Sequence, residues 1–201
     1  QRLDAQIYAK LNGLYALVGV INPAVEFTVS PKSTFQTEIV FSPWKYVNDH
    51  GVDKPMKFGI LMTEYRRYFK QHNWGWYLGA NMGMMGFKMS KPQFSDGWFL
   101  ENRYSKGYGM MIGICGGFEY QFADRWLLDA YFGWSYMLSW YNGYSLDGTI
   151  DLYPHRPVQL EKPDPFNGSH EWLPNKIGVS IGFMIFNPAR RGRTGSSCAV
   201  R

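Results

Sequence analysis

Apolar residues alternate with polar or small residues along most of the chain, and this period of two is typical of strands with two different faces. Between Ile177 and Ile185 every second residue is apolar and branched or aromatic, while Gly178, Ser180 and Gly182 lie between them. The same alternation predicts an all-β fold with eight strands, at about residues 5–17, 23–30, 34–43, 56–70, 74–88, 107–122, 125–140 and 175–187.

The connections between these strands are of two kinds, and the kinds alternate. Tight turns are expected at residues 31–33, 71–73 and 123–125, and long polar loops at 44–55, 90–106 and 141–174, with 19–22 as a short exception. An even strand number with short turns at one end and long loops at the other is typical of outer-membrane barrels. We therefore expect an eight-stranded antiparallel up-and-down transmembrane β-barrel over residues 1–187, with short periplasmic turns and longer extracellular loops.

Periodicity alone does not decide which face of the strands is enclosed, because a soluble lipocalin-like barrel shows the same alternation with its apolar face inward. A face in contact with water is dense in Lys and Glu, whereas the polar face here is mostly Gly, Ser, Asn, Gln and Tyr. The apolar face has no charge across its middle. Aromatic residues are predicted near both ends of that face, as in the two girdles of a membrane barrel: Phe69, Trp76, Tyr120 and Phe122 by the turns, and Tyr15, Phe87, Tyr136 and Trp140 by the loops.

Composition and charge agree with this interpretation. Aromatic residues make up 18% of the 201 residues and charged residues another 18%, and no apolar run reaches the roughly 18 to 20 residues of a membrane-spanning helix. Part of the net charge of +5 lies at the C-terminal end, in Arg190, Arg191, Arg193 and Arg201. Residues 188–201 are expected to be a basic, disordered periplasmic tail, and no nucleic-acid partner is predicted.

Seven charged residues share the polar face, and carboxylates near an arginine are a pattern that could support acid–base catalysis. The interior of an eight-stranded barrel is only wide enough for side chains to fill it, and charges buried there must be paired. We therefore expect a polar network that plugs the lumen, with no catalytic residue, formed by Lys10, Glu26, Glu38, Glu64, Arg66, Glu119 and Asp129.

No cofactor or metal is predicted. The four histidines, at residues 50, 72, 155 and 170, have no metal-ligand spacing with one another or with a cysteine. Some outer-membrane barrels are lipid hydrolases that use Ser, His and an acid on the outer wall. Ser169, His170 and Glu171 offer these residue types, although adjacent in one loop, so an enzyme acting on lipid or surface glycan stays an alternative.

The predicted long loops and their borders are rich in aromatic residues and arginine, a composition typical of binding surfaces. An equally good interpretation is that these side chains pack the loops on each other and anchor at the lipid headgroups. The loop binding candidates are Trp44, Tyr46, Trp98, Phe99, Arg103, Tyr153, Arg156 and Trp172.

Several short motifs occur in the same order as in a known group. They are Leu11-Asn12-Gly13-Leu14-Tyr15-Ala16, Asn22-Pro23-Ala24-Val25-Glu26-Phe27, Phe41-Ser42-Pro43-Trp44-Lys45, Thr63-Glu64-Tyr65-Arg66-Arg67-Tyr68-Phe69 and Leu173-Pro174-Asn175-Lys176-Ile177-Gly178. With them the chain resembles a domain-of-unknown-function family of small outer-membrane β-barrels from Bacteroidota, over most of residues 5–187. The resemblance implies export and a Gram-negative source, and it implies no activity. The family's barrels commonly end at the aromatic residue of the last strand, here Phe186, whereas this chain continues for fifteen residues.

These observations favour a non-enzymatic outer-membrane barrel, similar in architecture to the OmpA and OmpX barrels, with a structural, surface-binding or accessory-subunit role. The expected partners are outer-membrane lipid, lipopolysaccharide and another outer-membrane or surface protein. The first residues lack the basic and apolar regions of a signal peptide, so we expect a mature chain located in the outer membrane of a Gram-negative bacterium. A soluble lipocalin-like carrier is the other alternative.

Overall fold

The fold is all-β. A computed structural model describes residues 6–91, 100, 103–146 and 171–187. Within these residues one short helix, α1 (Gly13–Leu17), accompanies nine strands, which are β1 (Ile7–Asn12), β2 (Pro23–Ser30), β3 (Ser33–Phe41), β4 (Tyr46–Asp49), β5 (Val52–Tyr68), β6 (Trp74–Met89), β7 (Arg103–Ala123), β8 (Trp126–Ser145) and β9 (Glu171–Phe186).

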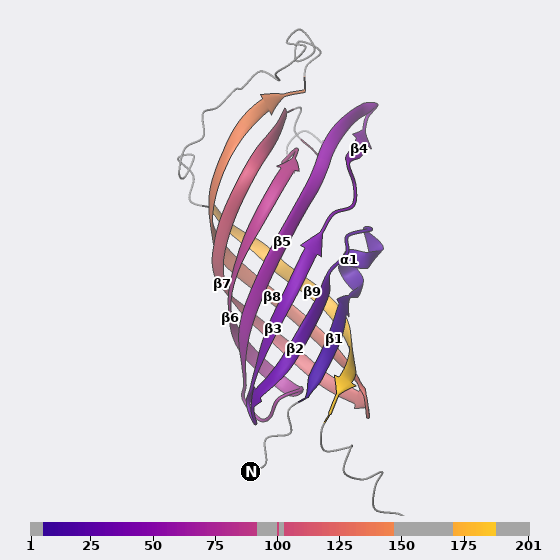
Figure 1. The fold of residues 1–201 in the computed structure, drawn as a ribbon, viewed down its shortest axis with the longest axis vertical. Coiled ribbons are helices and arrows are strands. Elements are labelled where there is room, and N and C mark those ends of the chain that lie inside the picture. Colours follow the sequence, from indigo (N-terminus) through magenta and orange to yellow (C-terminus); the bar gives the residue numbers. More distant parts are fainter. Residues whose placement is uncertain (1–5, 92–99, 101–102, 147–170, 188–201) are drawn as a thin grey trace, which may run out of the picture.

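The strands form one antiparallel sheet that closes on itself. Its order is β3-β2-β1-β9-β8-β7-β6-β5-β4, and a further pairing of β3 with β5 joins the two sides into a ring. In Figure 1 the long strands tilt around a common axis, with the β2–β3 and β7–β8 turns at one end. Strand β4 lies beyond the ring and pairs with the start of β5, so that Tyr46 is opposite Pro55.

The ninth strand is a difference from the predicted eight. Residues 46–49 were expected in a polar loop, but β4 and β5 form a hairpin across His50 and Gly51, whose φ angles are 53° and 84°. Two consecutive residues with positive φ are the requirement of the tight turn that matches the twist of a hairpin. The Asn48 side chain supports the turn by accepting a hydrogen bond from the Gly51 amide at 3.1 Å.

The first predicted strand, residues 5–17, is too long. β1 ends at Asn12, where the Asn12 Oδ1 atom accepts hydrogen bonds from the amides of Leu14 at 3.0 Å and Tyr15 at 3.4 Å. Asparagine caps helices in this way, so the chain turns into α1. Tyr15 therefore lies on a helix and not in the strand position that the aromatic girdle required.

Besides β5, which begins at Val52, three more strands at the loop end extend several residues beyond their predicted bounds. β7 begins at Arg103, β8 continues to Ser145 and β9 begins at Glu171, so the ladder extends into the segments expected as loops. A stacked aromatic pair accompanies this extension, with ring centroids 5.0 Å apart for Tyr104 and Tyr144. Such cross-strand pairs add to the stability of a ladder.

The two faces of the strands are segregated as predicted. Among the described residues, 23 buried residues are polar or charged and 14 are apolar, whereas large apolar side chains such as Leu61, Ile114 and Trp76 are exposed. The expectation that the polar face is enclosed is thereby confirmed. None of the helices in the described part of the chain has the length and apolar character that a membrane crossing demands.

Candidate functional site

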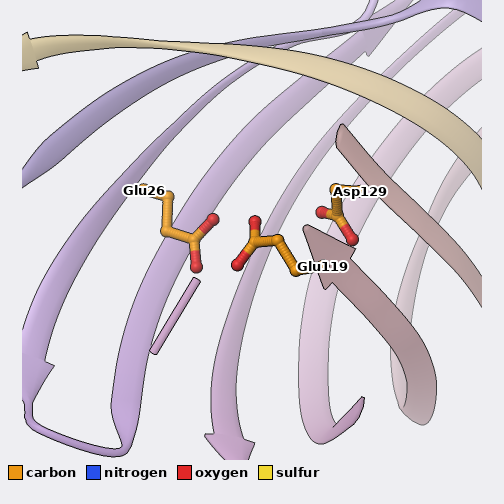
Figure 2. A group of neighbouring side chains, drawn as sticks. All are labelled: Glu26, Glu119 and Asp129. Atoms are coloured by element: carbon orange, nitrogen blue, oxygen red, sulfur yellow. The ribbon is translucent and has the colours of Figure 1, made fainter. Parts of the chain in front are cut away.

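A cluster of charged side chains occupies the interior of the ring near its turn end. The Lys10 ammonium contacts the carboxylates of Glu26, Glu119 and Asp129, at 3.0 Å in the case of Asp129. These residues come from β1, β2, β7 and β8, and Figure 2 shows the three carboxylates converging on one another. Each lies on the inward face of its strand, and closure of the ring brings the four side chains together.

Arg66 on β5 extends this cluster. Its guanidinium lies 2.5 Å from Glu64, 2.7 Å from Asp129 and 3.4 Å from Glu26. The same group lies over the ring of Tyr77, with 4.6 Å between the Arg66 Cζ atom and the ring centroid. Arg66 thus joins carboxylates that face the interior from β2, β5 and β8, and its side chain is fully buried.

The sequence did not place Lys176 in the network, although the residue follows the same period-two register on the polar face. The Lys176 ammonium lies 2.6 Å from Glu64 and 3.0 Å from Glu38. The seven predicted residues and Lys176 together form the set that we call the lumen network. Three cations and five carboxylates thus share one enclosed space, and each cation contacts more than one carboxylate.

Buried tyrosines add hydrogen bonds to the lumen network, and sequence reasoning missed them too. The Tyr68 hydroxyl contacts Glu119 and donates to Glu26 at 3.0 Å, and the Tyr77 hydroxyl donates to Asp129 at 2.9 Å. The period of two already gave the signal, because both tyrosines fall on the inward face of their strands. Tyrosine hydroxyls satisfy carboxylate oxygens that have no water to bond to.

Glycines make room for these side chains. A Cβ atom at Gly79 would lie 3.0 Å from the Glu64 carboxyl carbon, and one at Gly117 would lie 2.5 Å from the Tyr77 ring. Gly79 and Gly117 therefore serve packing inside the ring.

The side chains of the lumen network fill the interior of the ring and contact one another directly. Oxygen atoms of Glu26, Glu119 and Asp129 lie within 4.8 Å of one another, a spacing that a metal ion could bridge. The Lys10 ammonium contacts all three and so takes the position of such a cation. The network side chains that form ion pairs expose between 0 and 5% of their surface, so no reactant of appreciable size reaches them in this conformation.

Four of the loop binding candidates lie within the described residues, and they come from different parts of the sheet. Trp44 and Tyr46 are exposed near β4, Arg103 begins β7, and Trp172 near the start of β9 packs its ring 5.4 Å from that of Tyr136. Trp98, Phe99, Tyr153 and Arg156 lie outside the described residues, as do Ser169, His170 and the tail at 188–201.

One buried contact at the loop end was not predicted. The Lys54 ammonium lies 2.8 Å from Asp49 and 2.6 Å from the carbonyl oxygen of Leu100. The hydrogen bond from Lys54, with a second from His50, holds the pKa of the Asp49 carboxyl below its usual value. Lys54 thereby joins the β4–β5 hairpin to Leu100.

Comparison with known proteins adds a family but no activity. No curated protein and no solved structure matched the chain. One family did match, over residues 2–185, and it is described as a protein of unknown function, DUF3575. Since this match spans most of the 201 residues, the expectation of an uncharacterised domain family is confirmed, and the chain belongs to the DUF3575 family.

Proposed function

We propose that the chain is a non-enzymatic, eight-stranded outer-membrane β-barrel with a plugged polar lumen, which serves a structural, surface-binding or accessory role through its loop end. The eight strands of the barrel are β1, β2, β3 and β5 to β9, which close the ring. In this proposal the turns face the periplasm of a Gram-negative bacterium, and the loops face the cell exterior. The motif resemblance given above favours a source in the Bacteroidota.

The inverted distribution of polarity carries the proposal. Arg66 is fully buried, whereas Ile114 exposes 69% and Trp76 exposes 66% of its surface. A soluble carrier needs the opposite arrangement, because exposed apolar area of this extent is costly in water. Lipid removes that cost, and closure of the sheet satisfies the strand edges that hydrocarbon would leave unpaired.

Aromatic side chains support the same orientation. Trp74 and Tyr120 lie opposite one another near the turns, and Tyr108 and Trp140 do so towards the loops. Between them the outward positions of β7 carry Met110, Ile112 and Ile114, and aromatic rings at both ends of an apolar band are typical of membrane barrels.

The lumen network supports a closed rather than a conducting barrel. Its charges are paired across the interior from β1, β2, β3, β5, β7, β8 and β9, so a continuous water column would need several of these pairs to separate. Breaking one buried pair costs about 3 to 5 kcal/mol. The barrel therefore serves as a rigid support, and contact with partners falls to the loops and the outer wall.

Heat modifiability tests the proposal directly. The full chain is folded in detergent and run on a denaturing gel with and without boiling. A change in mobility, together with recovery of the chain in the outer-membrane fraction, is the expected result. A water-soluble monomer whose mobility is unaffected by boiling would contradict the membrane barrel.

A second assay separates the enzymatic alternative from the proposal. Folded chain is incubated with lipid A and with surface glycan, and the products are followed by mass spectrometry. No turnover is expected. Turnover that is lost on substitution of His170 or of a lumen carboxylate would overturn the non-enzymatic assignment.

A further inference from the structure

Three lysines lie side by side on the outer face of the ring, towards the loop end. Lys57 on β5 is opposite Lys88 on β6, and Lys88 is opposite Lys106 on β7. Neighbouring strands are about 4.8 Å apart, so the three backbone positions span on the order of 10 Å. We call these residues the lysine row. Like charges directly opposite one another destabilise a sheet, so the fold bears a cost at this place.

Nothing in the described part of the protein neutralises this charge. No ion pair joins Lys57, Lys88 or Lys106 to an acidic residue of that part, and the position opposite Lys106 on β8 is the neutral Asn142. The Lys88 ammonium lies over the ring of Tyr104, 5.1 Å from its centroid. That contact orients the ammonium without cancelling its charge, so the row remains available to an anion.

A hollow begins directly beside the lysine row, one outward position closer to the middle of the strands. There Gly59 is opposite Gly86, and a Cβ atom added to either would meet no atom within 4 Å. The hollow has a volume of about 620 Å³, and its outward-facing lining is apolar, namely Ile39, Leu61, Met84, Tyr108 and Met110. This volume is within the range of about 300 to 1,000 Å³ for small-molecule sites. We call it the apolar hollow.

The lysine row and the apolar hollow together match an amphiphile. We propose that they bind one membrane lipid with a phosphate headgroup, with the phosphate on the three lysines and part of an acyl chain in the hollow. This inference rests on the proposed membrane barrel. From the loop end towards the middle of the strands, the outer surface changes from cationic to apolar between one outward position and the next. A lipid in the leaflet on the loop side has its charged headgroup and its acyl chains in the same order.

The charge arrangement favours a lipid over other occupants. A purely apolar partner would leave the three ammonium groups without an anion, and a soluble anion would leave the hollow without contacts. A phosphate-bearing lipid satisfies both at once, and in an outer leaflet it is present at high local concentration.

Native mass spectrometry of the full chain tests this inference. The chain is folded in a nonionic detergent and titrated with diphosphorylated lipid A, and the same titration is run with the dephosphorylated lipid. We expect one tightly bound phosphorylated lipid per chain, an affinity that falls as salt rises, and at least tenfold weaker binding of the dephosphorylated form.

Variants then locate the site. The triple change Lys57→Gln, Lys88→Gln and Lys106→Gln is expected to weaken binding at least tenfold. Gly86→Leu, which fills the hollow and leaves the lysines in place, is expected to weaken it severalfold. The matched control is Lys32→Gln with Lys70→Gln, because these exposed lysines lie near the turns at the opposite end and should leave binding unchanged.

Three results would overturn the inference. The first is that the triple variant binds the lipid as tightly as the wild type does. The second is that the control variant loses as much lipid affinity as the triple variant. The third is that inorganic phosphate competes for the site as effectively as the lipid does. Each variant is first checked for heat modifiability. A chain that shows no heat modifiability refutes the membrane barrel itself, whereas a heat-modifiable chain whose lipid binding ignores the lysine row refutes only this site.

Discussion

Arg66 and Arg67 are neighbours on β5 with opposite surroundings. Arg66 is fully buried among Glu26, Glu64 and Asp129, whereas Arg67 is exposed on the outer face, where it donates one hydrogen bond to the Ser33 hydroxyl at 3.0 Å. The same contrast runs through the whole ring. The inner face is held by ion pairs and tyrosine hydroxyls, and the outer face is apolar, with its cations near the two ends.

The difference indicates where the stability of this fold originates. In a soluble domain apolar burial dominates, but here the largest fully buried side chain is Arg66 and many large apolar side chains are exposed. The backbone ladder and the lumen network therefore carry the specificity of the interior. The outer face needs only to suit its surroundings, which we propose are lipid.

The strongest test of this contrast is Arg66→Ala compared with Arg67→Ala. Removal of Arg66 leaves buried carboxylates of Glu64 and Asp129 without one of their cations, and breaking a buried pair costs about 3 to 5 kcal/mol. Removal of Arg67 is expected to cost less than about 1 kcal/mol. Urea unfolding in detergent micelles, followed by tryptophan fluorescence, measures both values. Similar losses of unfolding free energy for the two variants would show that ion pairs on the inner face stabilise the fold no more than contacts on the outer face.

The second test places a charge on the outer face. Ile114→Lys puts an ammonium in the middle of the apolar band, and lysine at the bilayer midplane costs about 2 to 4 kcal/mol. Phe122→Lys lies on the same face of β7 near the turn and should cost no more than about 1 kcal/mol. The measurement is urea unfolding in lipid vesicles. A stability gain for Ile114→Lys would contradict a lipid-facing wall.

The sequence predicts which side chains face the interior better than it predicts which of them contact one another. Period-two alternation and the scarcity of Lys and Glu placed Glu64 and Arg66 inside, because both signals are local. The contact of Lys10 with Glu119 could not be predicted from the sequence. Glu119 lies 109 residues away and meets Lys10 only because the ring closes. Lys176 was missed for the same reason, as its contacts with Glu38 and Glu64 depend on the order of strands around the ring.

Local side-chain chemistry explains the remaining differences. The period of two continues past Asn12, so the pattern alone could not reveal that an asparagine cap starts α1 there. The β4–β5 hairpin depends on a two-residue turn at His50 and Gly51 within a polar segment that lacks alternation. At both positions hydrogen bonds between an asparagine side chain and a nearby amide fix the local structure, and the alternation pattern does not register them.

Asn12→Ala is the third test, and it concerns the point where the inner face meets α1. The change removes the helix cap and also the hydrogen bond that the Asn12 side chain donates to the Tyr131 hydroxyl at 2.9 Å. We expect a loss of about 2 kcal/mol in urea unfolding. The control is Asn22→Ala, which removes one hydrogen bond to the Ile39 carbonyl at 3.1 Å and should cost about 1 kcal/mol.

The smallest expected effect is a pH dependence of stability at the loop end. There the β4–β5 hairpin extends beyond the ring, so it has no inner and outer face of the kind compared above. The pKa of Asp49 is lowered in the folded chain by the hydrogen bond from Lys54. The stabilisation is therefore present above the pKa of the unfolded state and is lost as pH falls through the lowered folded value. Hydrogen exchange of the hairpin amides, corrected for intrinsic rates, should show protection that declines on acidification. Asp49→Asn should remove this decline, and Asp53→Asn on the same hairpin, which leaves the Lys54–Asp49 contact in place, should keep it.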